Sequence, residues 1–158
     1  MRDDLYGAWL QAVHGDDFFG VQNYERVRWD AKGKMPTSPT AIHNALGAEV
    51  YAGSLANAVR YAYKSTGVPI IVSEHGVNTP DDRIRASFIP AALAELKIAM
   101  DEGVPVKGYM HWSLLDNFEW ISGYSAQLGL CTVDRTTFQR TPKPSAAVYS
   151  AIARRNSL

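Results

Sequence analysis

The stretch Pro69-Ile-Ile-Val-Ser-Glu-His-Gly76 decides the fold class of this chain. An apolar, β-branched run leads directly to a carboxylate, Glu74, and the chain then turns on a glycine. Continuous apolar runs of this length are typical of strands buried on both faces of a parallel sheet. Barrel enzymes built on such sheets carry their reactive groups at the carboxyl ends of the strands. Glu74 is therefore the first candidate for a catalytic residue.

Further strands and helices are predicted on both sides of this strand. The strands cover residues 18–24 and 106–112, and the helices lie near residues 5–13, 54–66, 82–102 and 144–152. We predict that Ser54 and either Asp81 or Asp82 cap the middle helices, and that Pro90 kinks the third. Strands separated by helices imply a parallel sheet with right-handed crossovers. The predicted fold class is therefore α/β, in a single domain over residues 1–158.

The buried helix faces and the loops are also predicted from the pattern. The apolar face of the first helix contains Leu5, Ala8, Trp9, Ala12 and Val13, and that of the third contains Ile84, Phe88, Leu93, Leu96 and Met100. Residues 25–48 are polar and interrupted by Gly and Pro, which predicts a long loop over one face. A second irregular stretch is expected from the end of the third strand to about residue 140.

Composition excludes several classes of protein. Sixteen basic residues balance sixteen acidic ones, and no Lys/Arg stripe offers a surface for nucleic acid or an anionic membrane. The apolar content of 46% is that of a globular protein. Cys131 is the single cysteine, and neither a signal peptide nor a hydrophobic segment long enough to span a bilayer is found. A cytoplasmic protein with a neutral ligand is expected.

Unusual polar side chains follow each of the predicted strands. Gln22, Asn23 and Tyr24 follow the first, Glu74 the second, and the segment Trp112–Trp120 the third. Taken singly, a glutamate at a strand end is more often solvated or ion-paired, and a tryptophan is more often part of the core. In an α/β barrel, however, these positions share one rim. Aromatic rings beside amides and carboxylates suit a sugar, which offers both C–H faces and hydroxyls.

Two side-chain roles follow from this arrangement. We predict that the Tyr24 phenol hydrogen-bonds Glu74 on the neighbouring strand. This bond would keep the carboxylate ionised and oriented, as a nucleophile requires. The alternative is that Tyr24 is an ordinary aromatic residue of the strand. His75 and His111 do not have the spacing of metal ligands, and we interpret them as hydrogen-bonded histidines, so we predict no metal. No cofactor is expected either.

Two motifs in these segments resemble glycoside hydrolase family 1, the β-glucosidase type of retaining glycosidase. Ile71-Val-Ser-Glu-His-Gly76 is similar to the Ile-Thr-Glu-Asn-Gly motif of the family, whose glutamate is the nucleophile, and this assigns that role to Glu74. Trp112-Ser-Leu-Leu-Asp-Asn-Phe-Glu-Trp120 resembles the sugar-binding signature of the family. The resemblance implies that Trp112 forms a platform under the sugar ring, while Glu119 and Trp120 hydrogen-bond its outer hydroxyls.

A third segment, Asp17-Phe-Phe-Gly-Val-Gln-Asn-Tyr24, resembles a family strand that ends in Asn-Tyr-Tyr. The resemblance aligns Tyr24 with the tyrosine that contacts the nucleophile and places Gln22, a substrate-binding residue by this match, where asparagine is usual. Ser73, His75 and Gln127 also depart from the family pattern. The expected ligand is a β-glucoside or related small saccharide, with its exact sugar and aglycone left open.

The same resemblance covers only the C-terminal part of the family's (β/α)8 TIM barrel, with about three parallel strands and flanking helices. Retaining hydrolysis uses two carboxyl groups about 5 Å apart. The family's acid/base glutamate lies in an Asn-Glu-Pro motif, and this sequence contains no Asn-Glu pair. We therefore expect a truncated, catalytically incomplete β-glycosidase. Its unpaired sheet edges and the uncovered apolar faces of its helices are expected to favour self-association. The alternatives are a non-catalytic sugar-binding or interaction module, and one half of a split barrel that associates with a missing N-terminal half.

Overall fold

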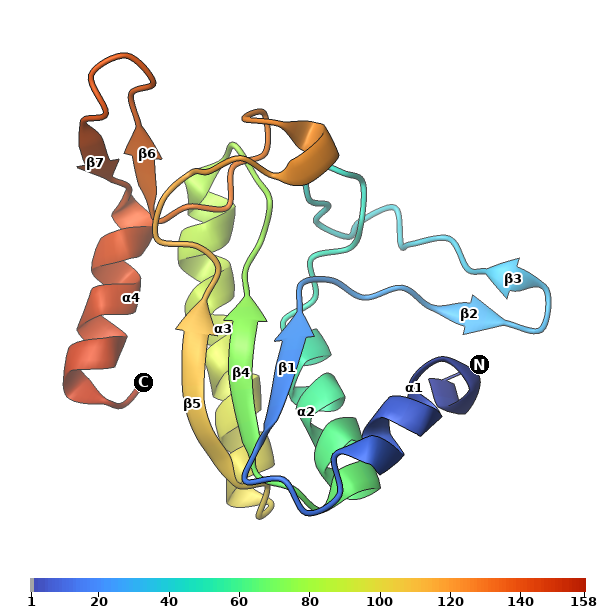
Figure 1. The fold of residues 1–158 in the computed structure, drawn as a ribbon. Helices are drawn as coiled ribbons and strands as arrows, with labels where there is room; N and C mark the ends of the chain where they lie inside the picture. Colours follow the sequence, from blue (N-terminus) through green and yellow to red (C-terminus); the bar gives the residue numbers. More distant parts are fainter. Residues whose placement is uncertain (1) are drawn as a thin grey trace.

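The computed structural model describes residues 2–158, and its centre is a parallel sheet in the order β1-β4-β5 (Figure 1). The strands are β1 (Phe19–Asn23), β4 (Ile70–His75) and β5 (Val106–His111). Ile70 of β4 is in register with Phe19 on one side and with Val106 on the other. The predicted parallel α/β sheet is confirmed. The outer edges of β1 and β5 pair with no other strand in the described part of the chain.

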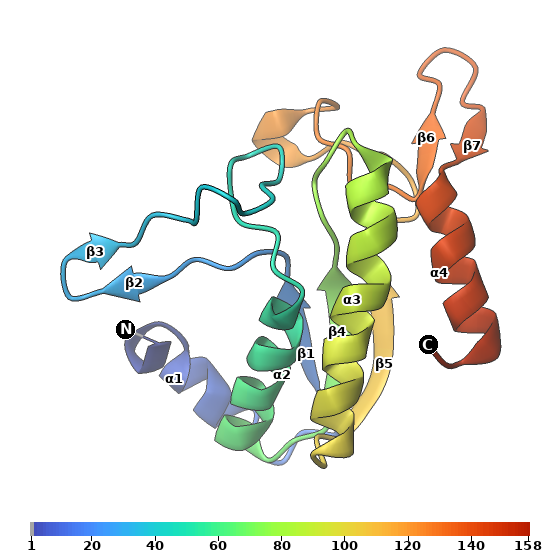
Figure 2. The ribbon, with the colours of Figure 1, turned by 180° about the vertical axis from the view of Figure 1, so that it is seen from behind.

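Two helices cover one face of this sheet and bury the core against it. They are α2 (Gly53–Thr66) and α3 (Asp82–Asp101), which lie in front of the strands in Figure 2. The fully buried apolar side chains of this layer include Leu55, Val59, Ile70, Val72 and Ala99. No helix lies over the opposite face in Figure 1. The remaining helices, α1 (Arg2–Ala12) and α4 (Pro144–Arg155), lie beside α2 and α3 respectively.

The helix ends follow the predicted signals with one exception. Gly67 ends α2 in the left-handed conformation with φ of 68°, and Asp81 caps α3 by accepting a hydrogen bond from the Arg83 amide. The prediction that Ser54 caps α2 is wrong. The helix begins at Gly53, so Ser54 lies inside its first turn, and its hydroxyl donates to the Glu25 carbonyl at 3.0 Å instead.

The predicted buried face of α3 is confirmed at Phe88 and Leu96, which are 5% and 3% exposed, but it needs correction at Met100. Met100 is 42% exposed, whereas the fully buried stripe includes Arg85, Ile89, Ala92 and Ala99. These buried residues are three, four and seven positions apart, as expected for one face of a helix. That face is rotated around the helix axis relative to the face that was predicted from the bulky apolar residues. Small alanines face the sheet because they allow close packing, and the burial of an arginine was not visible in the apolar pattern.

The predicted apolar face of α1 is not buried against the rest of the chain. Leu5 is 60% exposed and Trp9 is 73% exposed, while Leu10, on another face of the helix, is 7% exposed. Exposed apolar side chains of this size on one helix face mark a surface that normally packs against other chain segments. The expectation that some helix faces lie uncovered is therefore confirmed for α1.

The two long irregular segments each contain a short hairpin. In the first, β2 (Trp29–Asp30) pairs with β3 (Gly33–Lys34), and this hairpin projects away from the sheet in Figure 1. The second contains the 3-10 helix η1 (Trp120–Ser122) and a hairpin of β6 (Cys131–Val133) with β7 (Arg140–Pro142). Strands of two or three residues show no alternation in sequence, which is why both segments were predicted to be irregular throughout.

Candidate active site

The carboxylate of Glu74 lies at the end of β4 and is held by a tyrosine from the neighbouring strand. The Tyr24 hydroxyl donates to Glu74 Oε2 at 2.5 Å. Burial, the hydrogen bond to Glu74 and the negative charges of Glu74 and Glu119 raise the pKa of Tyr24 above its ordinary value of 10.0. The phenol therefore stays protonated and donates to a carboxylate that accepts. The predicted contact between Tyr24 and Glu74 is present, and it fixes the direction of one carboxylate oxygen.

The ends of β4 and β5 approach each other closely just beyond Glu74. The Trp112 amide donates to the His75 carbonyl at 2.8 Å. A Cβ atom on Gly76 would lie 2.0 Å from the Trp112 carbonyl oxygen, so no residue but glycine fits at this position without movement of the backbone. The peptide bond between Trp112 and Ser113 is cis. Gly76, two residues after Glu74, thus lets the loop after β5 lie against the end of β4.

That loop brings a tryptophan and a second carboxylate to the same rim. Trp112 Nε1 donates to Glu119 Oε1 at 3.0 Å, which ties the two ends of the segment together. The charge of Glu119 contributes to the raised pKa of Tyr24, so its carboxylate lies near the Tyr24–Glu74 pair. The three strand ends that were expected to share one rim are therefore close together, and they bring the carboxylates of Glu74 and Glu119, the Trp112 indole and the Tyr24 phenol to one edge of the sheet.

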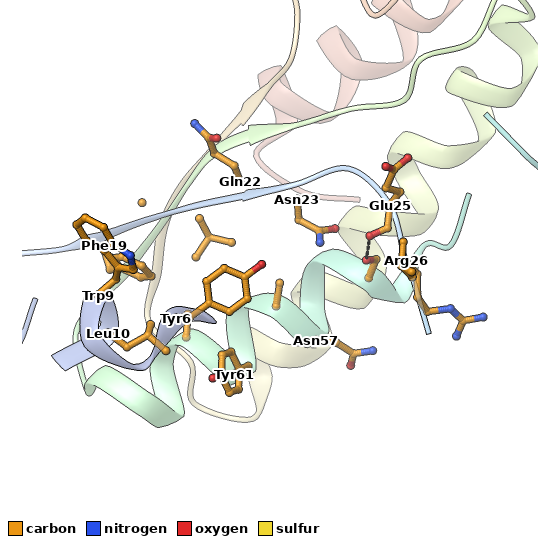
Figure 3. A pocket seen from close by; sticks show the side chains of 16 residues that line it. Tyr6, Trp9, Leu10, Phe19, Gln22, Asn23, Glu25, Arg26, Asn57 and Tyr61 are labelled. Carbon is orange, nitrogen blue, oxygen red and sulfur yellow. Dashed lines mark hydrogen bonds between the residues drawn. The ribbon is translucent and has the colours of Figure 1, made fainter. Parts of the chain in front are cut away.

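Two of the predicted sugar-binding residues are less closely tied to this group. Gln22 is in register with Glu74, and its exposed side chain points away from α2 in Figure 3. Trp120 is 84% exposed at the start of η1, with a φ of 48°. The described structure records no hydrogen bond from either side chain to Glu74. Their binding roles stay predictions.

Behind the site lies a buried cluster of two histidines, which were predicted to be hydrogen-bonded, around Tyr109, which was not predicted. His75 Nδ1 lies 2.9 Å from the Tyr109 hydroxyl, which lies 3.2 Å from His111 Nδ1. Burial lowers the pKa of His75 to about 3 and that of His111 to about 4, with smaller contributions from His111 and from Arg85 respectively. Both rings are therefore neutral near pH 7. The alternation of side chains along a strand could have predicted this cluster, because residues 75, 109 and 111 lie on the helix-covered face of the sheet when Glu74 lies on the other face.

Two cavities lie away from the Glu74 carboxylate. A cavity of about 420 Å³ lies between α1, β1 and α2, with Tyr6, Trp9 and Tyr61 among its walls (Figure 3). Another, of about 790 Å³, lies between β5, α3 and α4. Each lies at a free edge of the sheet. Within residues 2–158 no group of three metal-binding side chains is found, and no helix combines the length and apolar character needed to cross a bilayer.

Known proteins resemble this chain in both sequence and structure. The profile of glycosyl hydrolase family 1 matches residues 17–158. The β-galactosidase of Sulfolobus acidocaldarius is 37% identical over 78% of this chain and 24% of its own length. The thermostable β-glucosidase B of Thermobispora bispora is 34% identical over 96% of this chain and 36% of its own length. This chain thus spans between about a quarter and about a third of the length of these relatives.

Solved structures extend the likeness to the backbone. The β-glycosidase BGL167 superposes on 99% of this chain and 38% of its own, with a TM-score of 0.93 and 37% identity. The family 1 β-glucosidase of Thermotoga maritima covers 90% of this chain with a TM-score of 0.81 and 30% identity. The three parallel strands are therefore arranged as part of the barrel of these enzymes. On the profile match, the relatives and the superpositions, the chain belongs to glycosyl hydrolase family 1, and its fold is part of that family's (β/α)8 barrel.

Proposed function

We propose that Glu74 is the nucleophile of a retaining β-glycosidase, and that these residues supply the part of the site that holds the sugar. The observation that carries the proposal is the 2.5 Å hydrogen bond from Tyr24 to Glu74. A donor on one oxygen stabilises the ionised carboxylate and leaves the other oxygen to attack the anomeric carbon. The bond to the leaving oxygen breaks as the glycosyl ester forms, and water later releases the sugar with retained configuration.

The sugar is proposed to lie over the Trp112 indole. In this structure Trp112 Nε1 donates to Glu119, so both groups are held on the same side of the rim before any ligand arrives. The β-glucosidase of Thermotoga maritima has been solved in complex with deoxynojirimycin, a sugar mimic. By analogy, the ligand class here is a glucose-like ring in a small β-glycoside.

Proton transfer to the leaving oxygen needs a second carboxyl group. The sequence holds no Asn-Glu pair, and Glu119 is engaged by Trp112. We therefore propose that the acid/base group is supplied by barrel strands outside residues 1–158 or in another chain. Those strands would pair with the free edges of β1 and β5. The cavities at these edges and the exposed Trp9 support this part of the proposal. The second candidate, a sugar-binding module without chemistry, is favoured by the missing second carboxyl group.

Covalent labelling distinguishes the two candidates. A 2-deoxy-2-fluoro-β-glucoside with a dinitrophenolate leaving group reacts without an acid catalyst. The folded chain is expected to gain the mass of one fluoroglucosyl group, mapped to Glu74 by peptide analysis. Glu74→Gln should gain none, Glu95→Gln on α3 should react as the parent does, and Tyr24→Phe should react about tenfold more slowly or worse. Binding of the reagent by a folded chain without any mass gain would support the binding module and overturn the nucleophile assignment.

A further inference from the structure

The most deeply buried charge in the described structure is Arg85 on α3. Its side chain is 0% exposed, and Nη1 donates to Asp82 Oδ1 at 2.5 Å. The same carboxylate of Asp82 accepts hydrogen bonds from the Ser145 amide and hydroxyl at the start of α4. Burying an arginine side chain costs much free energy unless its charge is paired and its N–H groups donate hydrogen bonds. The ion pair with Asp82 alone therefore does not account for the burial of Arg85.

The Nη2 group of Arg85 reaches the backbone of two loops at once, whereas Nε has no hydrogen-bond partner in the described part of the chain. Nη2 donates to the Thr79 carbonyl at 2.9 Å and to the Gln127 carbonyl at 2.5 Å, and it lies 3.4 Å from the carbonyl of Val77. Val77 and Thr79 belong to the segment that follows β4, whereas Gln127 belongs to the segment that follows β5. One guanidinium group therefore joins the loops that leave the two central strands.

Further hydrogen bonds around Asn78 complete this junction. The Gln127 amide donates to Asn78 Oδ1 at 3.0 Å, and the Thr79 amide donates to the Gln127 carbonyl at 3.1 Å. The Asn78 carbonyl accepts from the Ala45 amide at 2.8 Å, which attaches the long loop after β1 as well. Asn78 is only 8% exposed. All three segments that leave the sheet strands are thus connected at Arg85 and Asn78.

The junction is linked to the site residues by short paths. Val77 is three residues after Glu74 in the sequence. On the other side, the Ser113 amide donates to the carbonyl of Leu128, the neighbour of Gln127, at 3.1 Å, and Ser113 follows Trp112 directly. A change at Arg85 would therefore move the Trp112 segment relative to Glu74 without touching either side chain.

We propose that Arg85 is a positioning residue that fixes where the Trp112 platform stands relative to the Glu74 carboxylate. This inference rests on the proposed function, because it concerns the alignment of the sugar with the nucleophile. Arginine suits the task because its planar group presents donors in a fixed fork, whereas lysine is a single point of charge on a flexible stem. Arg85→Lys keeps the charge beside Asp82 but cannot reach the loop carbonyls in the same geometry.

The first test is the kinetics of Glu74 labelling by the fluoroglucoside. Misplacement by about 1 Å costs about 100-fold in rate, so Arg85→Lys is expected to lower the limiting labelling rate constant by about that factor. The reagent concentration that gives half-maximal rate should change little, because Trp112 and Glu119 remain joined within one loop. A merely structural role would lower the fraction of molecules labelled, while the folded fraction reacted at the parental rate.

Matched variants separate positioning from general damage. Arg83→Lys lies on the same helix, with its side chain 92% exposed, and should leave the rate constant unchanged. Asn78→Ala removes the acceptor for Gln127 but leaves the Arg85 ion pair intact, so it should give a smaller fall in the same rate constant. A parental rate constant in both Arg85→Lys and Asn78→Ala overturns the proposal.

The second test does not depend on chemistry at Glu74. Hydrogen exchange is measured on the amides of Ala45, Thr79 and Ser113, which the junction holds, and on those of α2, which it does not. Arg85→Lys should speed exchange in the first group and leave the second unchanged. Unchanged exchange in both groups refutes the positioning role even when the parent chain is not labelled. Faster junction exchange with an unlabelled parent would refute the proposed function alone.

Discussion

Lowering the pH from 7 to 5 should destabilise this chain through its buried histidines. His75 is fully buried, and His111 is partly buried with its Nε2 atom enclosed. The charged or titratable groups that face them are Tyr109, Tyr149 and Arg85. None of these offers a negative charge to an imidazolium ion near neutral pH. Burial therefore lowers the pKa of His75 from 6.5 to about 3 and that of His111 to about 4.

The sign and size of the effect follow from these values. Below pH 6.5 the unfolded chain takes up protons on both rings, while the folded chain takes them up only near pH 4 and below. Stability is therefore complete above pH 6.5 and falls as the pH drops toward the folded values. At pH 5 each histidine removes about 2 kcal/mol, and the two together remove about 4 kcal/mol. That is a large part of the roughly 5–15 kcal/mol that stabilises a typical domain.

Urea unfolding followed by tryptophan fluorescence at pH 7, 6 and 5 measures this loss directly. His75→Gln should remove about half of the pH dependence, whereas His14→Gln, at an exposed position, should leave it as it is. Asp82 and Asp134 have pKa values below the ordinary 3.8, so their contribution to the free energy of unfolding is lost only at lower pH. They do not affect the comparison between pH 7 and pH 5. A free energy of unfolding that is the same at pH 7 and pH 5 would refute the reasoning.

Two other substitutions test the packing of the rim. Gly76→Ala should destabilise the fold by about 3 kcal/mol or more and lower the melting temperature in calorimetry, because its Cβ would lie 2.0 Å from the Trp112 carbonyl oxygen. Asp82→Asn should cost about 3 kcal/mol in urea unfolding, because it leaves the charge of the buried Arg85 without a counter-ion. Asp81→Asn should cost much less, because its partner Arg83 is exposed at the surface, and equal costs for the two aspartates would contradict this account.

The order of elements and the central residues of the site were predictable from local patterns. An apolar run that ends in Glu74 and Gly76 can be recognised because strand burial and the turn both depend on neighbours in sequence. The position of Tyr24 one strand away follows from the parallel connection, and the structure places its hydroxyl on Glu74. The catalytic and sugar-binding roles of these residues remain predictions.

Other features depended on contacts that no local pattern contains. Ser54 looked like a helix cap until the Glu25 carbonyl, far away in sequence, was found to accept its hydrogen bond. Trp120 belongs to a motif that can be recognised in the sequence, but its exposure depends on which other chain segments pack beside it at the rim. The unpaired edges of β1 and β5 likewise depend on which other strands are present.

The sequence by itself determined the α/β class, the helix and strand order, the candidate nucleophile and its tyrosine partner, because periodicity and turn residues act over short distances. Only the tertiary structure decided that Arg85 is buried and that His75, Tyr109 and His111 form one cluster. A charged or polar side chain normally prefers water, and its burial becomes favourable only when carbonyls and hydroxyls from distant segments arrive to meet it. Those partners are separated along the chain and are brought together only by folding.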